Sequence, residues 1–179
     1  MSRKEKIKYF FCEWKLPIIT FAVALFLFKV VFLLAIVPTA SMYPTLPSPC
    51  YSFSIRATYW FNNPVRGDIV LFYRENGSKT IFAKRIIGMP GDVVEIKHGI
   101  TYINGKILEE EYLRETPDNK NFGPFQVPDG YYFMMGDNRN NSYDSREWEE
   151  HFVSRNNILS KVYYSIPLSE LVDDEHEKG

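Results

Sequence analysis

The 179-residue sequence has little with which to bind a metal or to form a disulfide. Its two cysteines, Cys12 and Cys50, stand on either side of a long apolar run, and a membrane between them would keep them apart. The histidines His98, His151 and His176 are scattered without the spacing of metal ligands. We therefore expect no metal, no other cofactor and no disulfide, and we expect the three histidines at the surface.

The sequence also lacks an excess of basic residues, because its formal net charge is −1 and no basic stripe occurs. This argues against a nucleic-acid partner. The charge is nevertheless uneven: residues 1–15 hold five basic and two acidic residues, whereas the chain after residue 37 holds 15 basic and 20 acidic residues. Because basic flanks of a membrane span tend to stay in the cytoplasm, residues 1–15 are predicted inside and the chain beyond the span outside.

Residues 16–37 form the long apolar run, in which 16 residues are Leu, Ile, Val or Phe and Lys29 stands near the middle. At about 1.5 Å per residue, a helix of about 22 residues crosses a hydrocarbon core of about 30 Å. The lysine costs roughly 2.5 to 3.5 kcal/mol, which the apolar residues together exceed at roughly 0.3 to 0.6 kcal/mol each. A cleaved signal peptide is disfavoured by the length of the run and by Pro38 near its end.

The chain is therefore predicted to have a cytoplasmic basic arm (1–15), a transmembrane anchor (16–38), one extracytoplasmic domain (39–169) and a solvated acidic tail (170–179). Strands are expected at 69–73, 80–87, 93–96, 101–103, 106–108, 131–135 and 161–166, with a loop over 109–127. The pairs Asn76-Gly77 and Asn104-Gly105 are typical of hairpin turns. The fold class is mainly β: a single N-terminal membrane helix followed by a domain of antiparallel, barrel-like sheet.

Three segments carry candidate chemistry. Residues 37–46 read VPTASMYPTL and present Ser41 directly after the apolar run, between two prolines. Residues 82–92 read FAKRIIGMPGD, and alternation along a strand directs Lys84 to one face and Arg85 to the other. Residues 136–139 and 142–146 read GDNR and SYDSR, which are rich in groups that hydrogen-bond to backbone.

Chemically, a serine hydroxyl needs a base to take its proton. No histidine stands in a recognisable arrangement for that role. Lys84 is the alternative, because burial between Phe82 and Ile86 would disfavour its charged form and lower its pKa. Arg85 stays protonated and cannot act as the base.

Together, the three segments resemble the type I signal peptidases, which are membrane-bound Ser/Lys endopeptidases that remove signal peptides from exported preproteins. The resemblance covers about residues 16–166. It implies Ser41 as nucleophile and Lys84 as general base. It implies Thr39 as an oxyanion donor together with the Ser41 backbone N–H, and Ser142 as the group that orients the lysine. No cofactor is implied.

The same resemblance assigns supporting roles to Gly136, which lets backbone approach closely, and to Asp144 and Arg146, a pair that braces the site. It implies a single-pass protein of the bacterial inner (cytoplasmic) membrane whose partners are the lipid bilayer and preprotein signal peptides. Small residues are expected at the first and third substrate positions before the cut. The sequence departs from the family pattern at 47–50 and 149–151, beside the catalytic segments.

Two alternatives remain open from the sequence. A peptidase of the same clan dedicated to one client, such as a conjugative pilin, would carry the same residues. An inactive membrane-anchored binding module would retain the fold but lose Ser41 or Lys84, and both residues are present.

Overall fold

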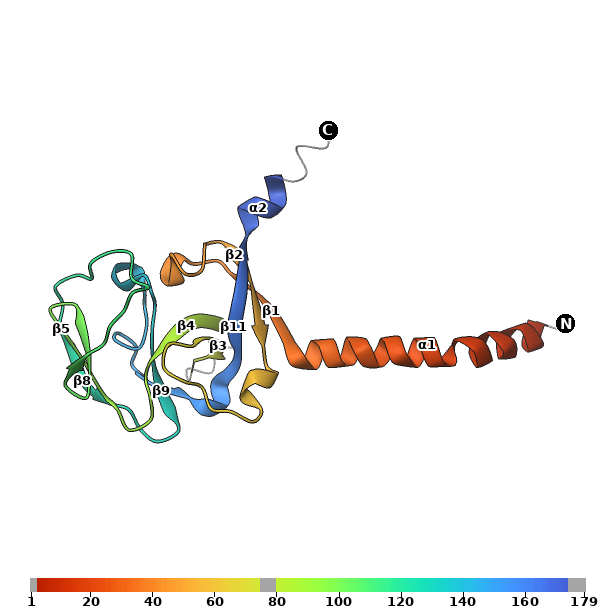
Figure 1. Ribbon diagram of the computed structural model, residues 1–179, viewed down its shortest axis with the longest axis horizontal. Coiled ribbons are helices and arrows are strands. Elements are labelled where there is room, and N and C mark those ends of the chain that lie inside the picture. The colour runs from red at the N-terminus through yellow and green to blue at the C-terminus, as the bar shows by residue number, and fades with distance from the viewer. Residues whose placement is uncertain (1–2, 75–79, 174–179) are drawn as a thin grey trace.

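The structure, a computed structural model, describes residues 3–74 and 80–173. Figure 1 shows a long helix, α1 (Arg3–Val31), that projects from a β domain, and a short helix, α2 (Leu168–Asp173), at the other end of the described chain. The mainly β, antiparallel architecture predicted from the sequence is confirmed.

The described strands form two antiparallel sheets. The larger, in the order β1-β2-β11-β3-β4-β9-β10, consists of β1 (Phe32–Val37), β2 (Cys50–Ile55), β3 (Ile69–Tyr73), β4 (Ile81–Gly88), β9 (Tyr131–Met135), β10 (Val153–Ser154) and β11 (Ile158–Pro167). The smaller, in the order β7-β6-β5-β8, consists of β5 (Val93–Lys97), β6 (Ile100–Ile103), β7 (Lys106–Ile107) and β8 (Phe122–Gln126). Single-turn 3-10 helices, η1 (Ala40–Met42), η2 (Ala57–Tyr59), η3 (Arg139–Asn141) and η4 (Arg155–Asn157), interrupt the connections.

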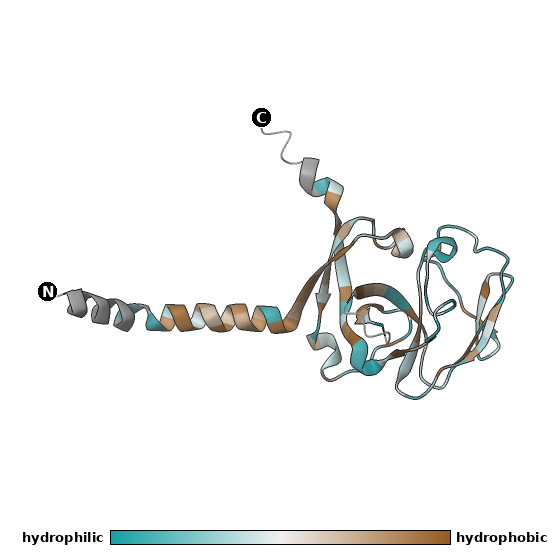
Figure 2. Ribbon diagram, turned by 180° about the vertical axis from the view of Figure 1, so that it is seen from behind, coloured by the Kyte–Doolittle hydropathy of each residue, from teal (hydrophilic) through white to brown (hydrophobic). Residues whose placement is uncertain are grey.

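The apolar run does not form one helix over residues 16–38, so that prediction is wrong at its C-terminal end. The helix ends at Val31, and Phe32–Val37 pairs with all six residues of β2. Phe, Ile and Val suit a strand as well as a membrane helix, and pairing with β2 satisfies the backbone of this segment. Figure 2 shows the apolar colouring continuing from α1 into β1.

The candidate membrane span is consequently shorter than the sequence suggested. It runs over Glu13–Val31, 19 residues whose side chains are exposed as far as Lys29 and half-buried at the last two positions. At about 1.5 Å per residue this stretch is close to the thickness of a hydrocarbon core. Lys29 therefore lies in the last turn of the helix and not near the middle of the span.

Other expected elements differ in extent. The predicted loop over 109–127 contains β8, and the final strand is longer than 161–166. The helix α2 begins at Leu168 and extends into the expected tail, which was predicted to start at residue 170. The Asn104-Gly105 turn is confirmed: both residues have positive φ, as a two-residue hairpin of this type requires. Strands β3 and β4 pair as expected, but the predicted turn Asn76-Gly77 between them lies outside the described residues. The same holds for residues 174–179, which include His176.

Two of the histidines can be located. His98 is exposed, as predicted. His151 is half-buried, its Nδ1 lies 2.7 Å from the carbonyl oxygen of Ser145, and its ring packs on Phe125. His151 is therefore only partly exposed, because a local hydrogen bond and an aromatic contact hold the ring against the domain.

Candidate active site

Ser41 lies on η1, in the connection between β1 and β2. Val37 before Ser41 and Met42 after it are both buried in the same apolar cluster, so the segment is anchored on both sides of the hydroxyl. Asn138 holds the backbone as well: its N–H donates to the Ser41 carbonyl at 3.0 Å, and its side-chain amide donates to the Ala40 carbonyl at 3.1 Å. Ser41 is thus fixed in position by packing and by hydrogen bonds.

Lys84 lies in the middle of β4, opposite Val70 of β3. Its side chain is buried, and its Nζ donates a hydrogen bond of 2.5 Å to Ser41 Oγ. Arg85, the next residue, binds the Asp137 carboxylate instead. The alternation predicted for this strand is confirmed, and the structure brings the serine and the lysine into direct contact across 43 residues of sequence.

Burial lowers the pKa of Lys84 from its ordinary 10.5 to about 8. Desolvation is the largest cause, because an ammonium removed from water loses hydration that few partners replace. Asp144 opposes this change, Arg146 reinforces it, and Asp137 opposes it more weakly. A substantial fraction of the amine is therefore neutral near pH 8, which is the form that can accept a proton.

Thr39 is exposed, and its hydroxyl lies 3.4 Å from Ser41 Oγ. Thr39 is the N-cap residue of η1, and its backbone is in the extended conformation. The hydroxyl is therefore close to the point where an attacking serine would develop charge on a substrate carbonyl. Its role as an oxyanion donor stays a prediction.

Gly136 follows β9 and has no space for a side chain. A Cβ at this position would collide with the Ser142 hydroxyl and with the carbonyl oxygen of Ser41. The Gly136 N–H donates to Asp144 at 2.9 Å. The close approach of backbone expected at this glycine is present, and it brings the Ser41 segment against the loop that carries Ser142.

Ser142 is near the pair but does not hydrogen-bond to Lys84. Its Oγ is buried and has no hydrogen-bond partner within residues 3–74 and 80–173. The reason is geometric: the hydroxyl lies against the Cα of Gly136, while the ammonium of Lys84 donates to Ser41. The hydrogen bond expected from the sequence is thus absent in this structure, and the orienting role stays a prediction.

Asp144 and Arg146 form a buried pair beside the site. Arg146 Nε and Nη2 reach the two Asp144 carboxylate oxygens at 2.8 and 2.9 Å, and Nη2 also donates to the carbonyl of Arg139 at 2.9 Å. Asp144 is fully buried. A bidentate pair with further hydrogen bonds holds the loop after β9 rigid, in agreement with the bracing expected from the sequence.

Asp137, in the GDNR string after β9, is a further residue of the site whose position no local sequence pattern predicts. Its carboxylate accepts from Thr45 at 2.5 Å and from Arg85 at 2.6 and 2.8 Å. One acidic side chain therefore ties the segment that follows Ser41 to the strand that carries Lys84. The sequence feature that indicates an acidic partner is Arg85, directly after Lys84. Alternation places its guanidinium on the opposite face of β4, where it binds Asp137.

A groove of about 350 Å³ opens beside the Ser41–Lys84 pair. It is lined by the end of β1, the start of β4, Leu71, Asn141 and Tyr143. Among the described strands, β1 pairs only with β2, and β9 pairs with β4 only from Arg85 onward. Two unpaired strand edges therefore face the groove, which suits a peptide in extended conformation.

These features define a class of protein. A serine hydroxyl bonded to a buried lysine of lowered pKa, at the end of a groove for an extended peptide, is the arrangement of a serine peptidase that uses an amine as base. The profile of the family described as "Signal peptidase, peptidase S26" matches residues 12–166. The chain belongs to this family, and it is a peptidase that removes signal peptides from preproteins.

Two relatives agree with this assignment by sequence. Signal peptidase I S of Bacillus subtilis is 37% identical over 182 residues, which cover 96% of this chain and 95% of the relative. Probable signal peptidase I-2 of Synechocystis is 39% identical over 150 residues, covering 79% of this chain and 67% of the relative. The crystal structure of a signal peptidase I from Enterococcus faecalis matches with a TM-score of 0.49 and 32% identity, covering 57% of this chain and 98% of that one. Neither the single-client peptidase nor the inactive module is favoured by the relatives from Bacillus subtilis and Synechocystis.

Proposed function

We propose that Ser41 is the nucleophile and Lys84 the general base of signal-peptide cleavage. The observation that carries this proposal is the 2.5 Å hydrogen bond from Lys84 Nζ to Ser41 Oγ within a buried site. Cleavage of a preprotein by purified Ser41 and Lys84 variants tests both roles.

The reaction follows from the two groups. Neutral Lys84 accepts the Ser41 proton as Oγ attacks the scissile carbonyl, and the resulting ammonium returns that proton to the departing amine. An acyl-enzyme ester on Ser41 remains. Lys84, neutral again, takes a proton from water, whose oxygen attacks the ester, and the proton then returns to Ser41. Thr39 Oγ1 and the backbone N–H of Ser41 stabilise the oxyanion in both steps.

The substrate binds as an added strand between β1 and β4. The two unpaired edges at the groove support this, since backbone hydrogen bonds would hold any extended sequence in register. Ala35, Leu71 and Ala83 contribute apolar surface to the groove. This lining is consistent with small substrate side chains before the cut.

α1 anchors the protein in the inner membrane of a bacterial cell, with residues 1–15 in the cytoplasm and the β domain outside. The 19-residue apolar stretch and the net charge of +3 in residues 1–15 support this orientation. Ser41 then lies a few residues beyond β1, close to the surface at which a signal peptide leaves the bilayer.

We expect protease added outside intact spheroplasts to degrade the β domain and to spare the cytoplasmic arm. An epitope tag placed before Arg3 should survive on a fragment of the size of α1, while a tag placed after residue 173 is lost. The measurement is immunoblotting against both tags, with detergent-lysed cells as the control in which both disappear. Survival of the C-terminal tag in intact spheroplasts would overturn the orientation.

Ser142→Ala is expected to lower kcat by about tenfold to a few hundredfold, because a group that positions the base transfers no proton itself. The hydroxyl has no partner in the structure, so its removal should leave the thermal midpoint unchanged or slightly higher. Steady-state cleavage and thermal unfolding measure the two effects separately. An unchanged kcat would show that Ser142 does not orient Lys84 in the substrate complex.

A further inference from the structure

A second groove, of about 650 Å³, lies where α1 meets the β domain. Its walls are the last turns of α1, the start of β1, the end of β2 and Tyr163 of β11. Phe28 and Phe32 pack together across the helix–strand junction, with ring centroids 4.9 Å apart. The Arg56 N–H donates to the Val31 carbonyl at 2.7 Å, so the helix end is tied to the domain at this point.

This junction groove is on the opposite face of β1 from the active site. Directly paired residues of antiparallel strands share a face, and Phe32 pairs with Ile55 while Leu34 pairs with Phe53. Phe32, Leu34 and Phe53 are 43%, 55% and 42% exposed. Leu33, Ala35 and Val37 pack instead against the cluster beneath the sheet that contains Met42, and of these three only Leu33 also lines the junction groove. The junction groove is therefore separate from the path proposed for the substrate.

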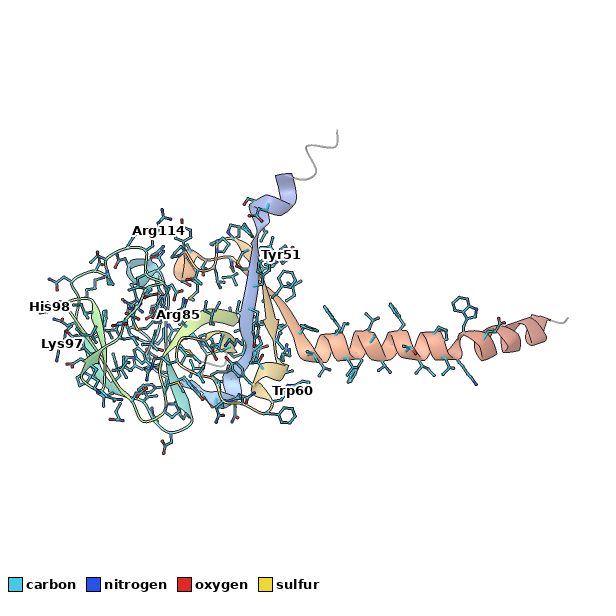
Figure 3. All side chains as sticks on the ribbon, viewed as in Figure 1. Tyr51, Trp60, Arg85, Lys97, His98 and Arg114 are labelled. Carbon is cyan, nitrogen blue, oxygen red and sulfur yellow. The ribbon has the colours of Figure 1, made fainter. Side chains whose placement is uncertain are left out.

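The position of the groove along α1 matches the headgroup region of a bilayer. If residues 13–31 span the hydrocarbon, the last turn of α1 and the start of β1 lie at the outer boundary. Figure 3 shows Trp60 on the side of the domain from which α1 leaves, and Lys97 and His98 on the opposite side. Trp60 is 51% exposed and Phe61 is 91% exposed. Exposed aromatic side chains of this kind are typical of residues at a membrane interface.

Two cations line this otherwise apolar groove, Lys29 and Arg56. Lys29 is exposed, Arg56 is half-buried, and neither side chain has an ion pair or hydrogen bond within the described ranges 3–74 and 80–173. Apolar walls and two cations whose charge no acidic group compensates fit a ligand that has both an anionic head and an apolar chain.

We propose that the junction groove binds an anionic phospholipid of the outer leaflet. Its phosphate lies between Lys29 and Arg56, and an acyl chain packs against Phe28, Phe32 and Phe53. The inference rests on the proposed membrane anchor. The bound lipid would contact both the last turn of α1 and β2. It would therefore hold the β domain at a fixed height above the bilayer.

Other occupants fit less well. An apolar helix of a signal peptide offers no anion to Lys29 and Arg56, and the substrate groove opens on the opposite face of β1. A second copy of this chain would bring a further Lys29 and Arg56 toward the same position, which like-charge repulsion disfavours.

The test uses the full-length protein in phosphatidylcholine nanodiscs that contain a trace of spin-labelled phosphatidylglycerol or spin-labelled phosphatidylcholine. Electron spin resonance measures the motionally restricted fraction of each lipid. We expect a preference for phosphatidylglycerol of about twenty-five-fold, since each of two cations near an anionic headgroup contributes about fivefold. Lys29→Gln/Arg56→Gln should reduce the preference to near unity while cleaving preprotein in detergent at the wild-type rate.

The matched control is Lys106→Gln/Lys120→Gln, which removes two exposed cations from the distant smaller sheet and its neighbouring loop. This control should keep the full preference. An equal loss in the control pair would mean a diffuse surface potential and would overturn the proposal. Displacement of the labelled lipid by inorganic phosphate at constant ionic strength would equally overturn it, because a simple anion site needs no acyl chain.

Two further readouts separate the remaining possibilities. A photoreactive benzoylphenylalanine at position 53 should cross-link to lipid, whereas cross-linking to bound preprotein would assign the groove to the substrate and overturn the proposal. Alkaline carbonate extraction tests the anchor by itself. Release of the wild-type protein would refute the anchor, whereas retention without any lipid preference would refute only the phospholipid site.

Discussion

Ser41→Ala is expected to lower preprotein cleavage by at least about four orders of magnitude, which leaves no detectable product in an ordinary assay. Removal of a hydrolase nucleophile leaves only the contribution of substrate binding and oxyanion stabilisation. Folding should be retained, because the alanine removes one hydroxyl from a segment held by buried Met42 and by Asn138. Cleavage kinetics and thermal unfolding of the purified variant measure the two properties.

Ser48→Ala is the matched control, since Ser48 lies in the same connection between β1 and β2 and its hydroxyl donates to the Pro38 carbonyl at 3.0 Å. It should cleave preprotein at close to the wild-type rate. Residual turnover of Ser41→Ala at a few per cent of wild type would show that another group attacks the substrate, and Thr39 would then be the first candidate, because its hydroxyl is 3.4 Å away.

The pairing of Ser41 with Lys84 was implied by the family resemblance, whereas the orientation and the burial of Lys84 could be predicted from local pattern. Alternation along a strand determines which way Lys84 points, and the apolar neighbours Phe82 and Ile86 predict its loss of hydration. The existence of strands β3 and β4 is predicted by alternation and apolar content in the same way. These properties need no knowledge of distant pairing.

What could not be predicted depends on partners far along the chain. Phe32–Val37 suits a membrane helix and a strand equally, and only its pairing with β2 decides between them. Asp137 meets Thr45 across 92 residues of sequence, and no local pattern indicates that contact. Ser142 was assigned by resemblance to a bond with Lys84, whereas the approach of Gly136 brings its hydroxyl into a position without a partner.

The use of an amine as base predicts a particular pH dependence. Only neutral Lys84 can accept the Ser41 proton, and burial lowers the pKa of Lys84 to about 8. The rate constant kcat/KM should therefore rise with pH along an acid limb whose midpoint is near 8 in the free enzyme. A flat profile between about pH 6 and 9 would contradict the proposed base. A midpoint near 10.4 would indicate an unburied lysine, and a midpoint near 6.5 would indicate a histidine.

Stability should vary in the same direction. The pKa of Lys84 is lower in the folded protein than its ordinary 10.5, so folding is opposed by the cost of burying the charged form. That cost is fully present below about pH 8 and is relieved as the pH rises from about 8 to 10.5. Lys84→Met should remove it, and it should raise the free energy of unfolding at neutral pH by up to about 3 kcal/mol.

Lys84→Arg is expected to abolish cleavage although it keeps a positive charge at the same position. A guanidinium does not deprotonate in proteins and cannot take the Ser41 proton at any accessible pH. Because the lysine is only 4% exposed, the larger arginine also risks misfolding. Lys84→Met removes that ambiguity, since it should be folded, more stable than wild type and equally inactive. Cleavage by either variant at more than about a thousandth of the wild-type rate would show that the proton leaves Ser41 by another route, because loss of a general base is expected to cost about 10³-fold or more.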